Sequence, residues 1–242
     1  MVYLIFSDVH SNLEALQVFF EIANETSHDK LVCLGDMVGY GPDPNDVLNL
    51  IRDKVDIILA GNHDHAACGK ISTSYFNPYA YNATLWTRKV LSKENHEFLK
   101  SLPIYLKCEG IIWVHSSPFE PEQWHYLNSC KDAIENFEVL EETLCFMGHT
   151  HKPVVFEETS KNNVNLHKGP TIKFNFDNRY LINVGSLGQP RDGNPKSCFT
   201  KFDSETGELN FYRFIYNLEE TQSKIVKNGL PPFFAQRLSK GQ

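Results

Sequence analysis

The chain repeatedly places a short apolar run directly before a glycine, an acidic residue or a histidine, and this repetition limits the folds open to it. The first three runs, residues 2–6, 31–34 and 57–60, are rich in residues that favour β-strands. Between the first two, Ser11-Asn12-Leu13-Glu14 has the pattern of a capping box and predicts a helix to about residue 24. Residues 46–52 predict a second helix. Strands that alternate with helices indicate an α/β layered fold with parallel strands.

Strands dominate the rest of the chain. Apolar positions at helical spacing in residues 83–90 predict a helix with Trp86 as a core residue, and Ser92 is expected to cap another helix that ends before Pro103. The other elements are expected as a helix at about 131–142, a polar loop at 162–170, and strands at 111–114, 144–147, 154–157, 171–176, 180–184, 198–202 and 209–214. So many strands predict two stacked sheets flanked by helices.

Length, charge and cysteine content restrict the class of protein. The 242 residues, of which 41% are hydrophobic, suffice for one continuous core, so we expect a single domain over 1–242. A formal net charge of -7 gives no general attraction to nucleic acid or to an anionic membrane, and neither is an expected partner. The six cysteines form no CxxC pair and are expected to be reduced. The apolar start is too short for a signal sequence or membrane span, which favours a cytoplasmic location.

Five short segments carry the residues that are capable of chemistry, and each follows an apolar run. They are Asp8-Val9-His10, Gly35-Asp36, Gly61-Asn62-His63-Asp64, Val114-His115 and Gly148-His149-Thr150-His151. Ligand sites in α/β sheets form at such strand ends. In the first and last segments the potential ligands stand two residues apart, so in extended backbone they share a face and can converge on one cation. Together the segments offer two carboxylates, one amide and four imidazoles as ligands, enough for two divalent ions if one carboxylate bridges them.

A single histidine of this kind is more often a core or surface residue than a ligand, so the interpretation depends on all five segments together. The other histidines stand apart from the segments. His28, His96 and His167 lie in polar surroundings and are expected to be solvated, whereas a place near the site stays open for His125.

The five segments, in this order, resemble the calcineurin-like metallophosphoesterase family, whose pattern is DxH, GDxxG, GNHD, a histidine at a strand end and GHxH. The resemblance extends from Met1 to at least Pro195. Segments similar to the compact bacterial and archaeal branch of the family are Gly39-Tyr40-Gly41-Pro42, Phe76-Asn77-Pro78, Trp86-Thr87 and residues 183–191. The resemblance implies a four-layer αββα sandwich of two mixed β-sheets flanked by helices, with a metal site at the C-terminal ends of strands.

The resemblance also implies two metal ions, Mn, Fe, Zn or similar, divalent or of mixed valence, that share a hydroxide able to attack phosphorus. It distributes the ligands as Asp8, His10 and His151 on one metal, Asn62, His115 and His149 on the other, and Asp36 bridging both. His63 would protonate the departing oxygen, with a purely structural hydrogen-bonding role as the alternative. Asp64 would orient His63 and raise its pKa by proximity.

Other residues near these segments have two interpretations each. Arg191 could bind phosphate through its guanidinium group or pair with Asp192. Tyr40 is expected to be exposed near the metals, with a turn role as the alternative. His65 could support the ligands from behind. The aromatic residues at 75–86 could offer a stacking face to a nucleobase, but packing into the core is the favoured account.

The expected activity is hydrolysis of a phosphoester of a small molecule or nucleotide, with a phosphodiester favoured over a monoester. A protein phosphatase and a dinucleoside polyphosphate hydrolase, both of which the family contains, stay open as alternatives. A noncatalytic scaffold with this fold is disfavoured because the ligand set and His63 are complete. A nuclease would need a basic strip that this acidic chain lacks.

Overall fold

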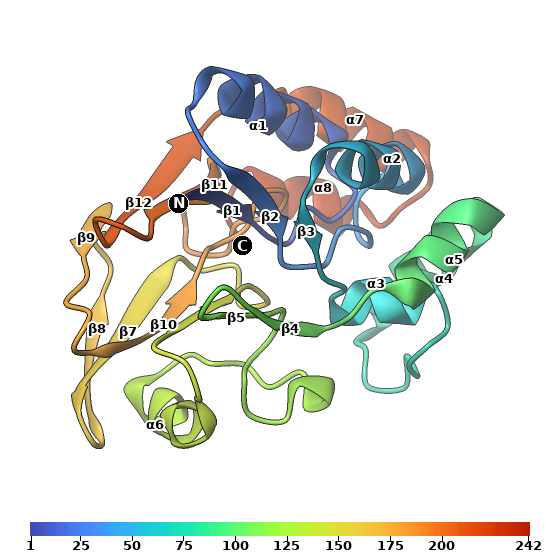
Figure 1. Cartoon of the computed structure of the whole chain (residues 1–242). Coiled ribbons are helices and arrows are strands. Elements are labelled where there is room, and N and C mark those ends of the chain that lie inside the picture. Colours follow the sequence, from blue (N-terminus) through green and yellow to red (C-terminus); the bar gives the residue numbers. More distant parts are fainter.

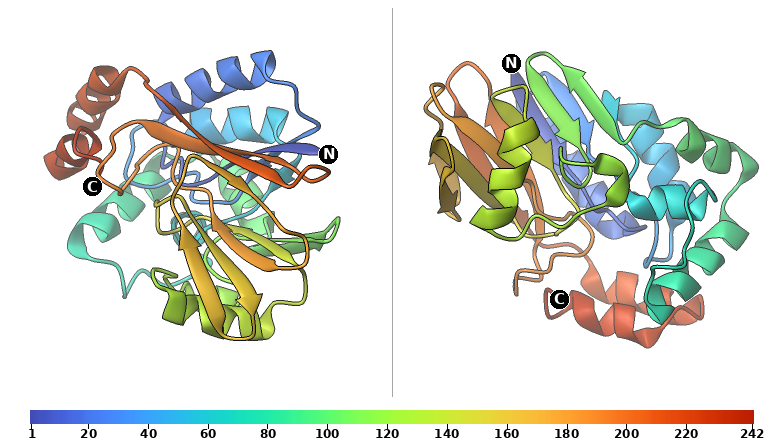
Figure 2. Two further views of the ribbon diagram at one scale, coloured as in Figure 1. Left: turned by 90° about the vertical axis from the view of Figure 1, so that its left-hand side faces the viewer. Right: turned by 90° about the horizontal axis from the view of Figure 1, so that it is seen from below.

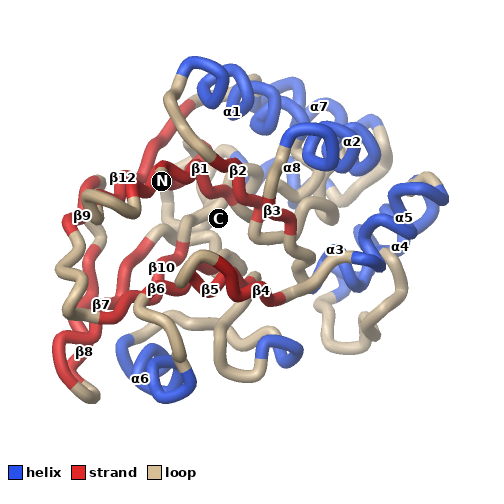
Figure 3. The backbone as a smooth tube through the Cα atoms, viewed as in Figure 1, coloured by secondary structure: helices blue, strands red, loops and turns tan.

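The computed structural model describes all 242 residues, and its strands form two six-stranded sheets (Figures 1 and 3). In spatial order, the first sheet contains β3 (Ile57–Ile58), β2 (Lys30–Cys33), β1 (Val2–Phe6), β11 (Ser197–Asp203), β12 (Glu208–Phe214) and β9 (Thr171–Lys173). The second contains β4 (Tyr105–Cys108), β5 (Ile111–Val114), β6 (Leu144–Met147), β10 (Arg179–Asn183), β7 (Val154–Ser160) and β8 (Asn163–His167). Parallel pairing holds within β1–β3 and among β5, β6 and β10, and all other pairs are antiparallel, so both sheets are mixed as predicted.

Alternation along the central strands produces the layers. In β1, Tyr3 and Ile5 belong to a core between the two sheets, whereas Leu4 and Phe6 pack in a second core beneath α1 (Leu13–Glu25) and α2 (Pro44–Lys54). The outer face of the second sheet is covered by α6 (Cys130–Val139) in a third core. Figures 1 and 2 show this order of helix, sheet, sheet and helix, which confirms the predicted four-layer αββα sandwich.

Three helices lie at one edge of the sandwich and two more follow the last strand. They are α3 (Asn62–Ala67), α4 (Pro78–Val90), α5 (Lys93–Ser101), α7 (Leu218–Lys227) and α8 (Pro232–Leu238). A fourth hydrophobic cluster joins α4 to α7 and α8. None of the helices combines the length and the apolarity that crossing a membrane requires.

The start of α1 differs from the expected capping box. Asn12, not Ser11, caps the helix, and its side chain accepts a hydrogen bond from Ala15 N at 3.1 Å. Glu14 reaches the C-terminal helices instead of the backbone of Ser11, because Thr221 Oγ1 donates to Glu14 Oε2 at 2.8 Å. The sequence pattern predicts no element for the residues of α7 and α8, and it therefore does not predict this partner of Glu14.

Several element boundaries also differ. Residues 163–167, expected in a loop, form the edge strand β8, whose exposed polar side chains hide its identity. The short strand β4 was not expected. Among the predicted elements, α6 ends at Val139, β7 continues to Ser160 and β9 ends at Lys173.

Candidate metal centre

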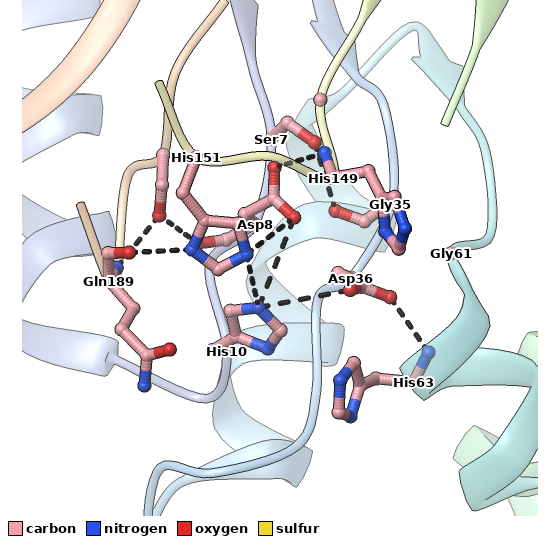
Figure 4. A network of polar contacts seen from close by, with 12 residues as sticks. Ser7, Asp8, His10, Gly35, Asp36, Gly61, His63, His149, His151 and Gln189 are labelled. Atoms are coloured by element: carbon pink, nitrogen blue, oxygen red, sulfur yellow. Dashed lines mark hydrogen bonds and ion pairs between the residues drawn. The ribbon is translucent and has the colours of Figure 1, made fainter. Parts of the chain in front are cut away.

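The five predicted segments meet at one end of the sandwich, where the parallel strands terminate. Asp8 follows β1, Asp36 follows β2, and Asn62 begins α3 just after β3. From the second sheet, His115 follows β5, and the segment with two histidines follows β6. Figure 4 shows most of these side chains pointing toward one another. The expectation of a site at C-terminal strand ends agrees with this arrangement.

The backbone at these positions is not extended, which corrects the reason given for convergence. Five of the seven predicted ligands lie in the left-handed region, with φ of 55° at Asp8, 48° at His10, 50° at Asp36, 66° at His149 and 60° at His151. Such conformations are sparsely populated for residues other than glycine and cluster at functional sites. The turn sends His149 and His151 to different groups of side chains, so the expectation that these two converge on one cation is wrong.

One group contains Asp8, His10 and His151, whose candidate ligand atoms lie within 4.8 Å of one another. Asp8 Oδ1 is 3.2 Å from His151 Nε2 and 3.9 Å from His10 Nε2. All three side chains are buried, and Asp8 Oδ1 has no hydrogen-bond donor. The three atoms form a cradle for one cation.

The other group contains Asp36, His115 and His149, again within 4.8 Å. Asp36 Oδ2 is 3.4 Å from His115 Nε2 and also 3.8 Å from His10 Nε2 in the first group. The carboxylate therefore stands between the two groups (Figure 4). Asn62 Oδ1 and His115 Nε2 are buried without a hydrogen-bond partner. Orphaned acceptors at a buried site need an explanation, and a bound cation supplies one.

Backbone carbonyls fix the tautomer of every predicted histidine ligand. Nδ1 of His10, His115 and His151 lies 3.0, 2.9 and 2.6 Å from the carbonyls of Val38, Leu34 and Gln189, respectively. His149 is turned the other way, with Nε2 3.0 Å from the Trp124 carbonyl. The proton on the bonded nitrogen leaves the lone pair of the other nitrogen directed at the site, as in known metal-binding histidines.

The resulting lone pairs oppose one another. With Nδ1 protonated, His10 Nε2 and His151 Nε2 are both acceptors, yet they lie 3.2 Å apart with no donor between them. A divalent cation that takes N and O ligands would convert this repulsion into ligation. The residues present therefore fit a pair of metal ions.

The pKa values of the candidate ligands show which of these side chains are neutral and which are charged at pH 7. Burial lowers the pKa of His149 to about 3 and holds that of His10 well below its usual value, so both imidazoles are neutral at pH 7, as ligands must be. Burial opposes a charge on His115, but Asp36 outweighs it and the pKa of His115 rises to about 9. Burial would raise the pKa of Asp36, yet His115 and other imidazoles hold it well below its usual value. Without a cation, His115 is therefore protonated beside Asp36, and a metal ion at this position would have to displace that proton.

Two glycines permit the close approach of the segments. A Cβ on Gly61 would lie 2.1 Å from Asp36 Oδ1, and one on Gly148 would lie 2.1 Å from Ser7 Oγ and 2.6 Å from Asp8 Oδ2. The glycines before Asn62 and His149 are therefore required by lack of space.

Asp64 has a different role from the expected one. Its carboxylate accepts backbone N–H groups of Met37 at 3.2 Å, Val38 at 3.0 Å and Gly61 at 2.9 Å, and it makes no hydrogen bond to His63. Burial, followed by the nearby Asp36, raises the pKa of Asp64 to about 7. Asp64 thus ties the Gly35-Asp36 loop to α3, and the expectation that it orients His63 is wrong.

His63 lies beside the two groups with a free ring. Its backbone N–H donates to Asp36 Oδ1 at 2.8 Å, but its buried Nδ1 has no hydrogen-bond partner. Burial lowers the pKa of His63 to about 4, with Arg191 acting in the same direction, so the expected rise is not seen. The ring borders a cavity of about 390 Å³.

Arg191 and Tyr40 lie together at the rim of the site. Asp192 pairs with Arg213, so the alternative that Arg191 pairs with Asp192 is wrong. Arg191 Nη2 donates to Gln189 Oε1 at 2.8 Å, while its buried Nε has no partner. Tyr40 is only 8% exposed, contrary to expectation, and its ring centroid lies 4.7 Å from that of His10.

The aromatic stretch is divided between the surface and the cavity beside His63. Tyr75, Tyr79 and Tyr81 are 95%, 51% and 42% exposed, and Trp86 is half-buried, so the favoured core packing is wrong for the tyrosines and incomplete for Trp86. Small residues form the buried face of α4 instead. The aromatic residues that line the cavity are Tyr40, Tyr75, Phe76, Trp124 and Tyr126.

The remaining histidines lie away from the ligand atoms. His65 Nε2 approaches the Leu102 carbonyl and Lys70 Nζ, both at 3.4 Å, so its ring makes no hydrogen bond to a candidate ligand. His125 and His167 pair with Glu120 and Glu157. His28 bonds to the carbonyl of Thr26, and His96 lies 3.5 Å from Glu97.

Sequence reasoning missed residues that act through the backbone or from distant segments. Trp124 orients His149 through its carbonyl, and Tyr126 stacks on the His149 ring with centroids 4.2 Å apart. A carbonyl leaves no signal in the sequence. The aromatic pair in the 124–126 segment was the only available hint.

Comparisons with known proteins agree with the fold. The chain matches the model of the calcineurin-like phosphoesterase superfamily domain over residues 1–207, and it therefore belongs to this family. An uncharacterized protein of Methanocaldococcus jannaschii is 41% identical over 98% of this chain and 97% of its own length. The crystal structure of a metallophosphoesterase from Sphaerobacter thermophilus has a TM-score of 0.88 and 36% identity, and the match covers 100% of this chain and 99% of that one.

A hypothetical protein of Pyrococcus horikoshii shares the fold, with a TM-score of 0.81 at 20% identity over 100% of this chain and 98% of its own. Membership of the phosphoesterase family makes the chain a hydrolase with a candidate metal centre.

Proposed function

We propose that the chain is one dinuclear metallophosphoesterase domain that hydrolyses a phosphodiester of a small molecule or nucleotide. One observation carries the proposal: Asp36 Oδ2 lies within 3.8 Å of an imidazole nitrogen in each of two buried ligand groups. Asp8, His10 and His151 would hold one ion, Asn62, His115 and His149 the other, and Asp36 both. Manganese, iron or zinc suits this mixture of oxygen and nitrogen ligands.

When bound, two such cations neutralise phosphoryl charge and lower the pKa of water. The side chains supply the remaining functions. His63 is the proposed proton donor to the departing oxygen, because its ring borders the cavity and its Nδ1 is not engaged elsewhere. An anionic phosphoester next to His63 would raise its pKa from the low value that burial imposes. Arg191, with a free buried Nε, is the proposed phosphate ligand from the protein.

Two separate cavities beside the ligands support a diester as substrate. One, of about 390 Å³, is lined by His63, His149 and aromatic side chains. The other, of about 880 Å³, is lined by Thr150, Arg191 and two lysines, Lys152 and Lys168. A phosphodiester carries two substituents, and each could occupy one cavity, whereas a monoester would leave one empty.

The test is a substrate panel assayed with each candidate metal alongside elemental analysis. We expect about two metal ions per chain and faster hydrolysis of acyclic phosphodiesters than of phosphomonoesters, of the cyclic diesters in cyclic nucleotides, or of dinucleoside polyphosphates. Protein stripped of metal should be inactive and regain activity when metal is returned. Binding of a single ion per chain, or turnover that does not depend on metal, would contradict the dinuclear assignment. Faster hydrolysis of a phosphoprotein or of a dinucleoside polyphosphate would show that a phosphodiester is not the preferred substrate.

A further inference from the structure

Two guanidinium groups meet at the ring of Tyr40. Arg191 Cζ lies 5.7 Å from the ring centroid, and Cζ of Arg237, which comes from α8, lies 6.0 Å from it. The same ring contacts the metal centre, with centroid distances of 4.7 Å to His10 and 4.5 Å to His63. The chain thus brings a cation from its C-terminal helices to the rim of the site.

Neither guanidinium group has an acidic side chain as partner. Arg191 donates to the side chain of Gln189, and Arg237 Nε donates to a main-chain oxygen of Gln242, the last residue of the sequence. By contrast, Arg52, Arg179 and Arg213 each pair with a carboxylate. Burial and the charge of Arg191 lower the pKa of Arg237 to about 10. Two partly buried like charges beside one aromatic ring repel each other, and a bound anion would relieve that repulsion.

The two C-terminal helices, α7 and α8, are held firmly against the end of the sandwich that contains the candidate metal centre. Thr221 Oγ1 donates to the buried Glu14, and Lys224 Nζ bonds to Glu14 and, at 3.0 Å, to Asp43. In α8, the ring of Phe234 packs 4.9 Å from that of Tyr40. Arg237 is therefore positioned by a seated helix.

The helices also lie outside the part of the chain that defines the family. The family model ends at residue 207, whereas α7 begins at Leu218. Arg237 therefore lies outside the residues that the family model matches, and a residue at such a position can distinguish among substrates.

We propose that Arg237, together with Arg191, forms a subsite for a second anionic group of the substrate, a phosphate separate from the one being hydrolysed. The inference rests on the proposed function. The metal ions and Arg191 would bind the scissile phosphate, and Arg237 would bind the second phosphate of the same substrate. The substrate class narrows to phosphodiesters that carry a further phosphate, such as 5′-esters of nucleoside 3′,5′-bisphosphates.

The test compares the 5′-p-nitrophenyl esters of thymidine 5′-monophosphate and thymidine 3′,5′-bisphosphate, which differ only in the second phosphate. Arg237→Met retains the length and packing of the side chain but removes its charge. We expect KM for the bisphosphate ester to rise roughly 10- to 100-fold, as for loss of a charge-assisted contact, with less than a twofold change for the other ester. Arg237→Lys should retain part of the preference. Lys227→Met, on exposed α7 surface, removes the same charge and should change neither KM.

Equal loss on both esters would place Arg237 at the scissile phosphate and overturn the subsite, and so would no loss on either. A binding measurement separates this inference from the proposed function. Calorimetric titration of the metal-loaded protein with thymidine 3′,5′-bisphosphate and thymidine 5′-monophosphate needs no turnover. If neither ester is hydrolysed, the proposed function fails. Tighter binding of the bisphosphate that is lost in Arg237→Met would still support the subsite, and equal binding of the two nucleotides by the wild type would reject it.

Discussion

Asp36→Asn is the sharpest test of the bridging carboxylate because it changes charge with almost no change in shape. The amide oxygen can still accept the His63 N–H that Asp36 Oδ1 now accepts at 2.8 Å, so the local backbone should be retained. The new amide nitrogen, however, would stand where Oδ2 now lies, 3.4 Å from His115 Nε2 and 3.8 Å from His10 Nε2. An N–H there would donate to the lone pairs that ligation requires.

The expected loss of metal affinity follows from Coulomb's law. A unit charge about 4 Å from another, at an effective dielectric constant of about 20, contributes about 4 kcal/mol. Since each 1.4 kcal/mol or so is a factor of ten, removing the carboxylate charge should weaken binding roughly 10³-fold. Both sites should be affected, because Asp36 lies beside both groups.

Metal content by elemental analysis and competition with a chelator of known affinity would measure the effect. Asp177→Asn, at an exposed position, is the matched control and should retain both ions. Circular dichroism would verify that the variant is folded. Two ions bound with wild-type affinity in Asp36→Asn, or weakening of one site alone, would refute the bridging role and require another residue to join the two groups.

Three further substitutions test other parts of the site. His10→Ala should weaken mainly one metal site by elemental analysis, and equal loss of both ions would show that the ligands are divided differently. His63→Ala should retain both metals yet lose about 10²- to 10⁴-fold in turnover, with a smaller loss on nitrophenyl esters, whose leaving group needs no proton, than on alkyl esters; a uniform loss would reject the proton-donor role. Gly148→Ala should lower the free energy of unfolding by roughly 1–3 kcal/mol, because the added methyl group overpacks the site. The control Gly169→Ala, whose added methyl group would have only the Thr171 carbonyl nearby at 3.6 Å, should leave thermal denaturation nearly unchanged.

The sequence revealed the fold and the candidate ligands because both depend on side chains in regular patterns. Alternating apolar residues in β1 separate the core between the sheets from the core under α1, and this alternation is visible without a structure. The candidate ligands are side chains of restricted chemical type at strand ends, so their positions can be read directly. Boundaries were less accessible: β8 alternates Val164 and Leu166 with polar residues over only five positions, and Leu166 is exposed.

What the sequence could not provide depends on the backbone and on distant contacts. Every residue has a backbone carbonyl, so the sequence does not reveal that the carbonyls of Trp124 and Gln189 fix two histidine tautomers. Asp64 stands next to His63 in sequence, which suggested a partnership, but helical geometry directs its carboxylate to the amides of the Asp36 loop. Arg237 is far from every motif, and only the packing of α8 on Tyr40 brings it to the site.

The left-handed residues show why the ligand positions are so closely specified by the fold. Five candidate ligands lie at positive φ, and each such conformation costs on the order of 1 kcal/mol or more for a residue other than glycine. Strain of this kind persists only where surrounding contacts impose it. Here Asp8 N and His10 N donate to the carbonyls of Gly35 and Asp36 at 2.9 and 3.0 Å, so the two loops hold each other in the strained form. The hydrogen bonds between loops therefore set the ligand directions before any cation binds, and the opposed imidazole nitrogens of His10 and His151 are a consequence of that preorganisation.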